Sequence, residues 1–372
     1  MQCNAVSLAG FRNIEEATVH FSPGVNVLYG ENAQGKTNLL EAIYFAAIGR
    51  SFRSLHAKES ISFGRETASI SLDFHAQGRV QNITMHLFQS RMRTVEKNHV
   101  KIHKMSELVG AFRAVLFCPE QLSLIKGGPA ERRQFLDIAI SALEPAYLGA
   151  LQRYAQILKQ RNALIRAAEK ERDAFRDTVD VWSAQLAHEG AYIARSRKRY
   201  IDKAMPFVAR CFAEMTNEKE TPTLVYLGCN KQEDADYEDV AATEAYLYKR
   251  LCENHDREIG AGATLYGIHK DDLEVMLNGR EARIYASQGQ QRSLALALKL
   301  AEGELCREDC GEYPVFLFDD VLSELDAARR EYLLHKIAGK QVILTTCEKI
   351  EEKTDHLILV EKGMFREVSP RK

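Results

Sequence analysis

The feature that most constrains the fold is the segment Gly-Glu-Asn-Ala-Gln-Gly-Lys-Thr at residues 30–37. It matches G-x-x-x-x-G-K-[ST] at every defined position, with an apolar run at 25–29 before it and an amphipathic run at 38–48 after it. A strand, a glycine-rich loop and a helix in this order surround phosphate groups with backbone N–H groups and a helix N-terminus. The sequence therefore predicts a P-loop domain built on a parallel sheet.

The loop also predicts the cofactors, ATP and Mg²⁺. Lys36 is expected to bridge the β- and γ-phosphates and to assist catalysis, and the Thr37 hydroxyl is expected to bind Mg²⁺. The residues expected to contact the nucleotide in this loop are Gly30, Glu31, Asn32, Ala33, Gln34, Gly35, Lys36 and Thr37.

A P-loop needs a second carboxylate near the metal, and the chain offers a pair. The apolar run at 315–318 is followed by Asp319 and Asp320. Fully buried parallel strands have such apolar runs, and ligands bind at their carboxyl ends. Asp319 is the expected outer-sphere Mg²⁺ partner, and Asp320 is the catalytic candidate that polarises the attacking water.

A second anion-binding segment, Ser-Gln-Gly-Gln at 287–290, leads into a helix at 293–300. It resembles the signature loop of the ABC ATPase superfamily, and the segment 323–326 resembles the D-loop of that superfamily. The resemblance implies that Ser287, Gly289 and Gln290 contact the γ-phosphate held by another subunit, and hence that ATP stabilises a homodimer.

The pattern along the chain predicts an interrupted domain. The first hundred residues are rich in strand patterns, residues 130–210 are helical, and strands return after 265. Two antiparallel helices of some 25–30 residues are expected, joined near residues 174–178. The predicted fold class is α/β: an ABC/SMC-head-like P-loop ATPase domain, 1–125 and 265–372, with an inserted, mainly helical lobe at 126–264.

Details across nearly the whole chain resemble the RecF family of recombination-repair ATPases, which are relatives of the SMC proteins. The matching segments are Phe-Arg-Asn at 11–13, Thr-Asn-Leu-Leu-Glu-Ala at 37–42, Ser-Phe-Arg at 51–53, Cys-Pro-Glu-Gln-Leu at 118–122, Lys-Gly-Gly-Pro at 126–129, Arg-Arg-Gln-Phe-Leu-Asp at 132–137, Gly-Ile-His-Lys-Asp-Asp at 267–272 and Phe-Asp-Asp-Val-Leu-Ser-Glu-Leu-Asp at 318–326.

This resemblance implies an ATP-dependent DNA clamp in recombinational repair that acts with RecR and RecO mediators to load RecA. Arg53, Arg132 and Arg133 are candidate contacts to DNA phosphates. Gln121 is a catalytic candidate in the Q-loop, although Glu120 remains an alternative. Two other functions stay open, the nucleotide-binding subunit of a transporter and a monomeric P-loop kinase.

Departures from related ATPases favour slow hydrolysis. The strand that precedes residues 345–347 ends without the switch histidine of transporter ATPases, and Asp320 is one methylene shorter than the usual Glu. Ile268 and Lys270 replace the usual Pro and Arg, and Lys lacks the bidentate guanidinium fork. A timed switch fits these residues better than a pump.

The charge distribution is uneven although the net charge is only −2. Residues 50–210 contain 27 basic and 16 acidic residues, a net of +11, whereas 211–264 contain 5 basic and 12 acidic ones. The basic part is where a DNA backbone is expected to bind. Eight cysteines without a CxxC pair and no apolar stretch of ~20 residues indicate a cytoplasmic protein with reduced thiols and no membrane association.

Overall fold

The structure, a computed structural model, describes residues 1–372 except 55, 169–171, 217–219, 230–236, 350–353 and 369–372. The chain forms two compact units, Met1–Gln121 with Leu296–Lys372, and Leu122–Ala295. The sequence predicts that the chain leaves the ATPase domain at 125 and returns at 265. By their contacts, however, residues 265–295 belong to the second unit, and this segment includes 287–290.

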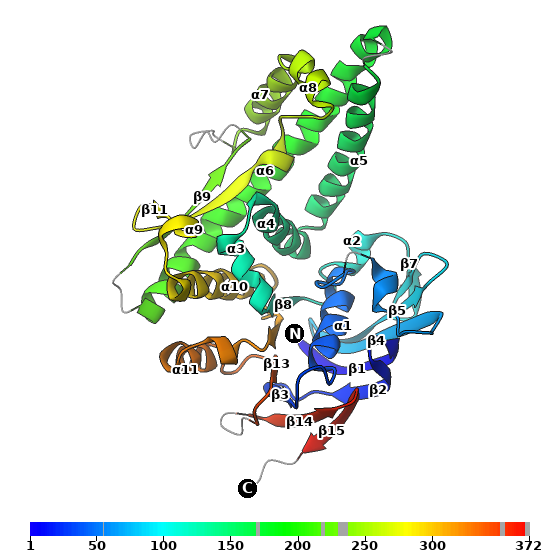
Figure 1. Cartoon of the computed structure of the whole chain (residues 1–372), viewed down its shortest axis with the longest axis vertical. Coiled ribbons are helices and arrows are strands. Elements are labelled where there is room, and N and C mark those ends of the chain that lie inside the picture. The colour runs from blue at the N-terminus through cyan, green and yellow to red at the C-terminus, as the bar shows by residue number, and fades with distance from the viewer. Residues whose placement is uncertain (55, 169–171, 217–219, 230–236, 350–353, 369–372) are drawn as a thin grey trace. The chain divides into compact units, whose positions relative to one another are not determined.

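The first unit contains the expected parallel sheet (Figure 1). Its strand order is β15 (Met364–Val368), β14 (His356–Glu361), β3 (Val25–Tyr29), β13 (Val342–Thr346), β12 (Val315–Asp319) and β8 (Ala114–Phe117). All neighbours are parallel except the β14–β15 pair. Every residue of β12 and β13 is buried, which explains their uninterrupted apolar runs.

A second sheet in the same unit is antiparallel. Its order is β2 (Ile14–His20), β1 (Gln2–Phe11), β4 (Thr67–Ala76), β5 (Arg79–Phe88), β6 (Thr94–Lys97) and β7 (Val100–Ile102). Buried residues nearly alternate with less buried ones along β4, so one face of this sheet is turned toward the core.

Helix α1 (Lys36–Ile48) packs against strands of both sheets. Leu39, Ile43 and Phe45 are fully buried in one cluster with Phe74 of β4 and Leu317 of β12. Because α1 is covered on several sides, it is apolar around most of its circumference rather than along one stripe. The helix that follows the P-loop is therefore held rigidly. Two more helices belong to this unit, α2 (Met105–Leu108) and α11 (Ala327–Lys336).

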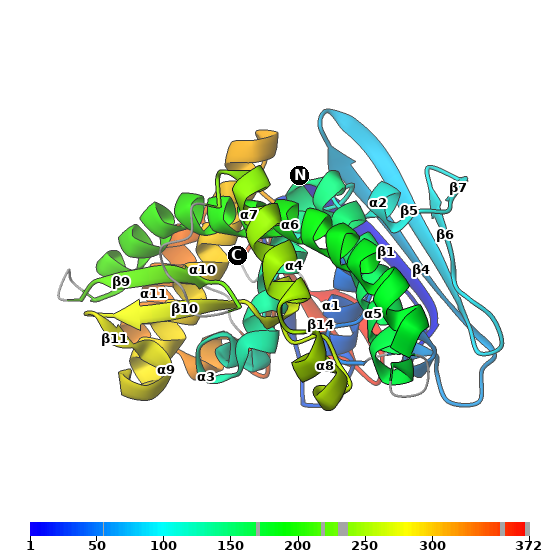
Figure 2. The same ribbon diagram turned by 90° about the horizontal axis from the view of Figure 1, so that it is seen from above.

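The second unit combines helices with a small antiparallel sheet (Figure 2). The helices are α3 (Ser123–Lys126), α4 (Pro129–Leu143), α5 (Pro145–Ala167), α6 (Arg172–Thr216), α7 (Val240–Cys252), α8 (His255–Ala261) and α9 (Ala282–Tyr285). The sheet has the order β11 (Arg280–Glu281), β10 (Asp272–Leu277) and β9 (Pro222–Leu227). Helix α10 (Gln288–Cys310) begins in this unit and continues into the first.

The helical hairpin consists of α5, with 23 residues, and α6, with 45. The prediction of a joint near 174–178 was wrong, because α6 begins at Arg172 and includes those residues. Helix α6 also continues past Pro206, since its buried face extends through Val208 and Phe212. No helix among the described residues is long and apolar enough to cross a bilayer.

Candidate nucleotide-binding site

The P-loop connects the end of β3 to the start of α1 as the sequence predicts. Its backbone requires positive φ angles, 150° at Gly30 and 115° at Gly35. A Cβ atom on Gly30 would collide with the carbonyl oxygen of Val360 in β14. Only glycine can therefore hold this tight turn beside the neighbouring strand, which leaves the loop amides free to face a ligand.

A cavity of about 460 Å³ lies beside this loop. All its described lining residues belong to the first unit: Asn13, Asn32, Ala33, Gln34, Gly35, Lys36, Thr37, Asn38, Arg53, Asp319, Asp320, Thr345 and Cys347. The P-loop and the paired aspartates thus meet at the carboxyl ends of β3 and β12, as predicted. Gly30 and Glu31 contribute backbone carbonyls that bind Lys36.

Lys36 is buried, and its ammonium group is held by neutral acceptors. Its Nζ donates hydrogen bonds to the carbonyl oxygens of Gly30 and, at 2.7 Å, Glu31. Charge-assisted hydrogen bonds to phosphate oxygens are stronger than bonds to carbonyl groups. A phosphate in the cavity is therefore a better partner for Lys36 than the loop itself.

Thr37, Asp319 and Thr345 form a hydrogen-bonded group at the base of the cavity. The Thr37 and Thr345 hydroxyls each donate to Asp319 Oδ1 at 2.8 Å. Burial raises the pKa of Asp319, and the two hydroxyl bonds oppose this shift. A hydroxyl and a buried carboxylate in contact are hard oxygen donors of the kind that Mg²⁺ prefers, so these residues fit a magnesium ion.

Asp320 adopts a left-handed backbone conformation with φ 52°, which is uncommon for a residue with a side chain. Its N–H donates to Thr345 Oγ1 at 2.9 Å, and its carbonyl accepts from Ser323 Oγ at 2.7 Å. These bonds hold the turn after β12 and keep Asp320 in the cavity wall. Nearby Asp326 caps α11 by accepting from the Arg329 N–H at 2.9 Å.

Arg53 lies at the nucleotide cavity, although the sequence analysis assigns it to DNA. Its Nη1 donates to Asn38 Oδ1 at 2.7 Å and lies 3.7 Å from Glu41 Oε2. Glu41 is fully buried in α1 and also accepts from Arg12 Nη2 at 2.6 Å and from the Ser51 hydroxyl at 2.5 Å. Hydrogen bonds and an ion pair thus connect the short basic motif at 51–53 to α1, the helix that follows the P-loop.

Three polar residues of this cavity have no assigned role in the nucleotide site from the sequence: Asn13, Asn38 and Thr345. Asn38 Nδ2 donates to Asn13 Oδ1 at 2.8 Å, and Asn13 Nδ2 donates to the Ala33 carbonyl at 3.3 Å. The signal for Thr345 is its place at the end of β13, the strand beside β12, close to where transporter ATPases have their switch histidine.

The Q-loop candidates lie in a 3₁₀ turn at Pro119–Leu122 after β8. The Gln121 N–H donates to the Cys118 carbonyl at 2.9 Å. The charge of Glu120 contributes to the raised pKa of Asp319, so its carboxylate acts on the predicted metal partner. Neither residue is among the described residues that line the cavity.

Ser287 and Gln290 form a reciprocal cap at the start of α10. The Ser287 N–H donates to Gln290 Oε1 at 2.6 Å, and the Gln290 N–H donates to Ser287 Oγ at 3.3 Å. This is the S-x-x-Q capping box. The Gln290 amide also donates to Glu220, while the first turn of α10, which contains Gly289, has no acidic residue. The carboxylate of Glu220 therefore lies against this helix N-terminus, and an anion bound here would displace it from the Gln290 amide.

The other two candidate DNA contacts lie in α4. Arg132 is buried and donates two hydrogen bonds of 2.8 Å to Asp272. Arg133 Nη1 donates to the Asp271 carbonyl at 2.7 Å. Arg132 thus neutralises a carboxylate of the motif at 267–272 inside the second unit. This internal role argues against a contact between Arg132 and DNA.

Comparisons with known proteins agree with this geometry. Residues 3–364 match the family described as RecF/RecN/SMC N terminal domain. A protein of Staphylococcus carnosus named "DNA replication and repair protein RecF" is 38% identical over 371 residues, covering 98% of both chains. A protein of the same name from Limosilactobacillus reuteri is 40% identical over 340 residues, covering 90% of this chain and 89% of the relative.

Solved structures show the same fold. One described as "the recombination mediator protein RecF-ATP in RecFOR pathway" has a TM-score of 0.92 and 32% identity, and covers 99% of this chain and 97% of that chain. An SmcHead structure with a TM-score of 0.58 and 17% identity, covering 99% of this chain and 97% of that chain, shares the fold alone. The chain belongs to the RecF family, and the predicted α/β ABC/SMC-head-like fold is confirmed.

Proposed function

We propose that this protein is an ATP-dependent DNA clamp of recombinational repair whose homodimer encloses Mg·ATP between two chains. The observation that carries the proposal is that the chain has two phosphate-binding arrangements in different compact units. One is the P-loop cavity with Lys36 and Thr37, and the other is the capped N-terminus of α10 at Ser287. In a head-to-tail dimer, Ser287, Gly289 and Gln290 of one chain complete the nucleotide site of its partner.

The residues of the cavity support a slow ATPase reaction. Lys36 binds phosphate oxygens, and Thr37 with Asp319 holds Mg²⁺, which supplies charge neutralisation at the phosphates. Asp320 orients the attacking water, with its backbone fixed by Thr345 and Ser323. Its short side chain limits how closely it reaches that water, which suits a switch better than a pump.

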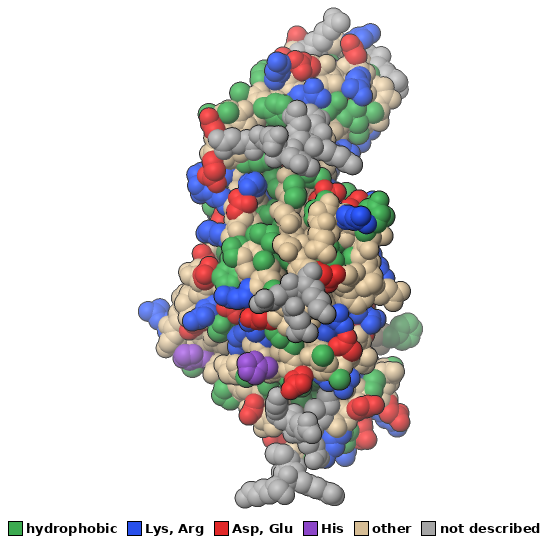
Figure 3. Space-filling model, turned by 90° about the vertical axis from the view of Figure 1, so that its left-hand side faces the viewer, with side chains coloured by type: hydrophobic (Ala, Val, Ile, Leu, Met, Phe, Trp, Pro, Cys, Tyr) green, Lys and Arg blue, Asp and Glu red, His purple; other side chains and the backbone are tan. Residues whose placement is uncertain are grey.

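Two observations support DNA as the partner: the names of the relatives and the basic segment of this chain. Residues 50–210 have a net charge of +11, which provides counterion-releasing contacts to a phosphate backbone. On the face in Figure 3, Lys and Arg side chains are interspersed with Asp and Glu side chains, so this face has no continuous basic field. DNA affinity is therefore modest for one chain and increases when ATP brings two chains together.

The same proposal includes the partners and place of action. RecR and RecO act as mediators with this protein in loading RecA on gapped DNA, and the solved relative is described as a recombination mediator in the RecFOR pathway. The protein acts in the cytoplasm, consistent with eight free cysteines in the structure. Among the candidate arginines, Arg133 is the remaining DNA contact, because it is partly exposed, unlike Arg132, and does not line the nucleotide cavity, unlike Arg53.

Light scattering with and without Mg·ATP tests the dimer. We expect the wild-type protein to dimerise with ATP, the Lys36→Ala variant to lose nucleotide binding, and the Ser287→Arg variant to bind ATP as a monomer. A wild-type protein that stays monomeric in saturating Mg·ATP would contradict the proposal and favour a monomeric P-loop kinase.

DNA affinity measured against salt tests the substrate class. A backbone-binding clamp shows a steep negative slope of log affinity against log salt, and ATP should increase the affinity. A kinase or a transporter subunit shows no such binding, so absence of DNA binding at low salt with ATP present would refute the clamp.

A further inference from the structure

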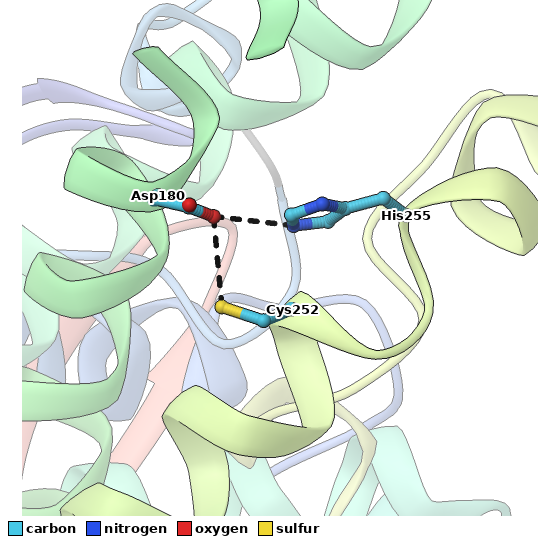
Figure 4. A group of neighbouring side chains, drawn as sticks. All are labelled: Asp180, Cys252 and His255. Atoms are coloured by element: carbon cyan, nitrogen blue, oxygen red, sulfur yellow. Dashed lines mark hydrogen bonds and ion pairs between the residues drawn. The ribbon is translucent and has the colours of Figure 1, made fainter. Parts of the chain in front are cut away.

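A group of metal-ligating side chains lies in the second unit, away from the P-loop residues in sequence and chemistry (Figure 4). Asp180 belongs to α6, Cys252 is the last residue of α7, and His255 is the first residue of α8. One ligand atom from each side chain lies within 4.8 Å of the other two. Asp180 Oδ1 is 3.6 Å from Cys252 Sγ and 3.8 Å from His255 Nε2.

These distances match the edges of a metal coordination shell. Zinc bonds of about 2.0–2.3 Å in a tetrahedron place neighbouring ligand atoms about 3.3–3.8 Å apart. His255 Nε2 is buried and makes no hydrogen bond with the residues that the structure describes. A buried ring nitrogen without a hydrogen bond is costly, and coordination to a metal would satisfy it better than the 3.8 Å approach to Asp180 does.

The surroundings fix the histidine ring in this position. Phe175 of α6 packs edge-on against the His255 ring, with centroids 5.6 Å apart. The ring held in this orientation places Nε2 at 3.8 Å from Asp180 Oδ1.

We propose that Asp180, Cys252 and His255 bind a zinc-class divalent cation, with the fourth position open to water. Thiolate and imidazole ligands select Zn²⁺ or Co²⁺ over Mg²⁺, so this site differs in chemistry from the all-oxygen group at Thr37 and Asp319. On binding, the Cys252 thiol loses its proton to solvent and its sulfur becomes bonded to the metal.

The cation would cross-link separate parts of the second unit. Asp180 and Cys252 are 72 positions apart, and α7 and α8 are joined by only two residues, Glu253 and Asn254. Coordination would tie the long helix α6 to the α7–α8 junction. A ligand that binds only the folded state stabilises it by mass action, so metal should raise the unfolding temperature.

Cobalt titration of the full-length protein, after removal of bound metals with a chelator, tests the site. Another thiol pair, Cys306 and Cys310 with Sγ atoms 3.6 Å apart, could contribute a signal, so the titration uses the background C306S/C310S. We expect one equivalent of Co²⁺ to produce a thiolate-to-cobalt charge-transfer band that Zn²⁺ abolishes, with release of protons.

Three ligand variants and one control complete the experiment. Cys252→Ser should abolish the charge-transfer band, and His255→Ala and Asp180→Asn should weaken Co²⁺ binding by about tenfold or more. Cys229→Ser removes another partly buried cysteine of the same unit and should change nothing. Unchanged ATP binding and far-ultraviolet circular dichroism show that each variant is folded.

Two results would overturn the proposal. One is a titration in which the background protein shows no charge-transfer band at Co²⁺ concentrations well above that of the protein. The other is a band that does not depend on Cys252: it persists in Cys252→Ser, or it disappears in the control Cys229→Ser. A zinc-induced rise in unfolding temperature that is lost in His255→Ala supports the same site by a readout independent of colour.

Discussion

Replacing Asp319 with Asn separates two effects of this carboxylate: its influence on the stability of the fold and its part in Mg²⁺-dependent ATP binding. Burial raises the pKa of Asp319, so the folded protein binds its proton more tightly than the unfolded chain does. Between the two pKa values the folded state holds more protons, and stability falls as pH rises through this window. Asp319→Asn removes this loss and retains an oxygen to accept from Thr37 and Thr345. The nucleotide-free variant should therefore be at least as stable as the wild type at pH 8.

The same substitution should weaken the effect of Mg²⁺ on ATP binding. Hydrogen bonds to a charged group contribute about 1.5–3 kcal/mol, which corresponds to a factor of about 10–150 in affinity. The measured quantity is the ratio of the ATP dissociation constants without and with Mg²⁺, from isothermal titration calorimetry. We expect this ratio to fall by about 10- to 150-fold in Asp319→Asn, while metal-free ATP binding is retained.

Asp320→Asn is the matched control, because it removes the same charge from the adjacent cavity residue. It should abolish hydrolysis and leave the Mg²⁺ dependence of binding close to that of the wild type. The reasoning is refuted if Asp319→Asn keeps the wild-type Mg²⁺ ratio, or if both variants lose it equally.

Two further predictions concern the second unit. Burial lowers the pKa of His269 to about 4, so between pH 4 and 6.5 the unfolded chain binds more protons than the folded one, and stability falls as the pH is lowered through this window. In urea titrations, His269→Asn should cancel about 2 kcal/mol of the loss between pH 8 and pH 5, whereas the raised pKa of Asp271, about 6, acts in the opposite direction in both proteins. An equal loss in both proteins would contradict this role. Arg161 and Glu258 form a fully buried ion pair at 2.6 Å, so Glu258→Ala should cost about 3–5 kcal/mol by urea unfolding, and the double replacement by Met should recover much of it. A loss below 1 kcal/mol for Glu258→Ala would show that the pair is solvated.

The sequence predicted the parts of the site whose chemistry is local. Gly30, Gly35 and Lys36 are required by one short loop, and Asp319 follows a strand whose apolar run marks it as buried. Because carboxyl ends of parallel strands share one sheet edge, the meeting of Thr37 with Asp319 followed from topology alone.

Contacts between distant segments could not be predicted. Arg132 was assigned to DNA as a basic residue of a matching motif, but it is buried and its partner Asp272 lies 140 positions away. Arg53 was assigned to DNA because nothing local showed that Asn38 and Glu41 bind it. The hairpin joint was misplaced because the polar, charged segment after Ala167 has weak helical periodicity.

The central claim is that the P-loop of one chain and the α10 N-terminus of another form one nucleotide site. Mixing Lys36→Ala with Ser287→Arg tests it most directly, because only the heterodimer contains one site with both Lys36 and Ser287. The account predicts that each variant alone stays monomeric in Mg·ATP by light scattering, and that the mixture yields dimers and measurable ATP hydrolysis. A mixture that behaves as the sum of its two components would contradict the shared site.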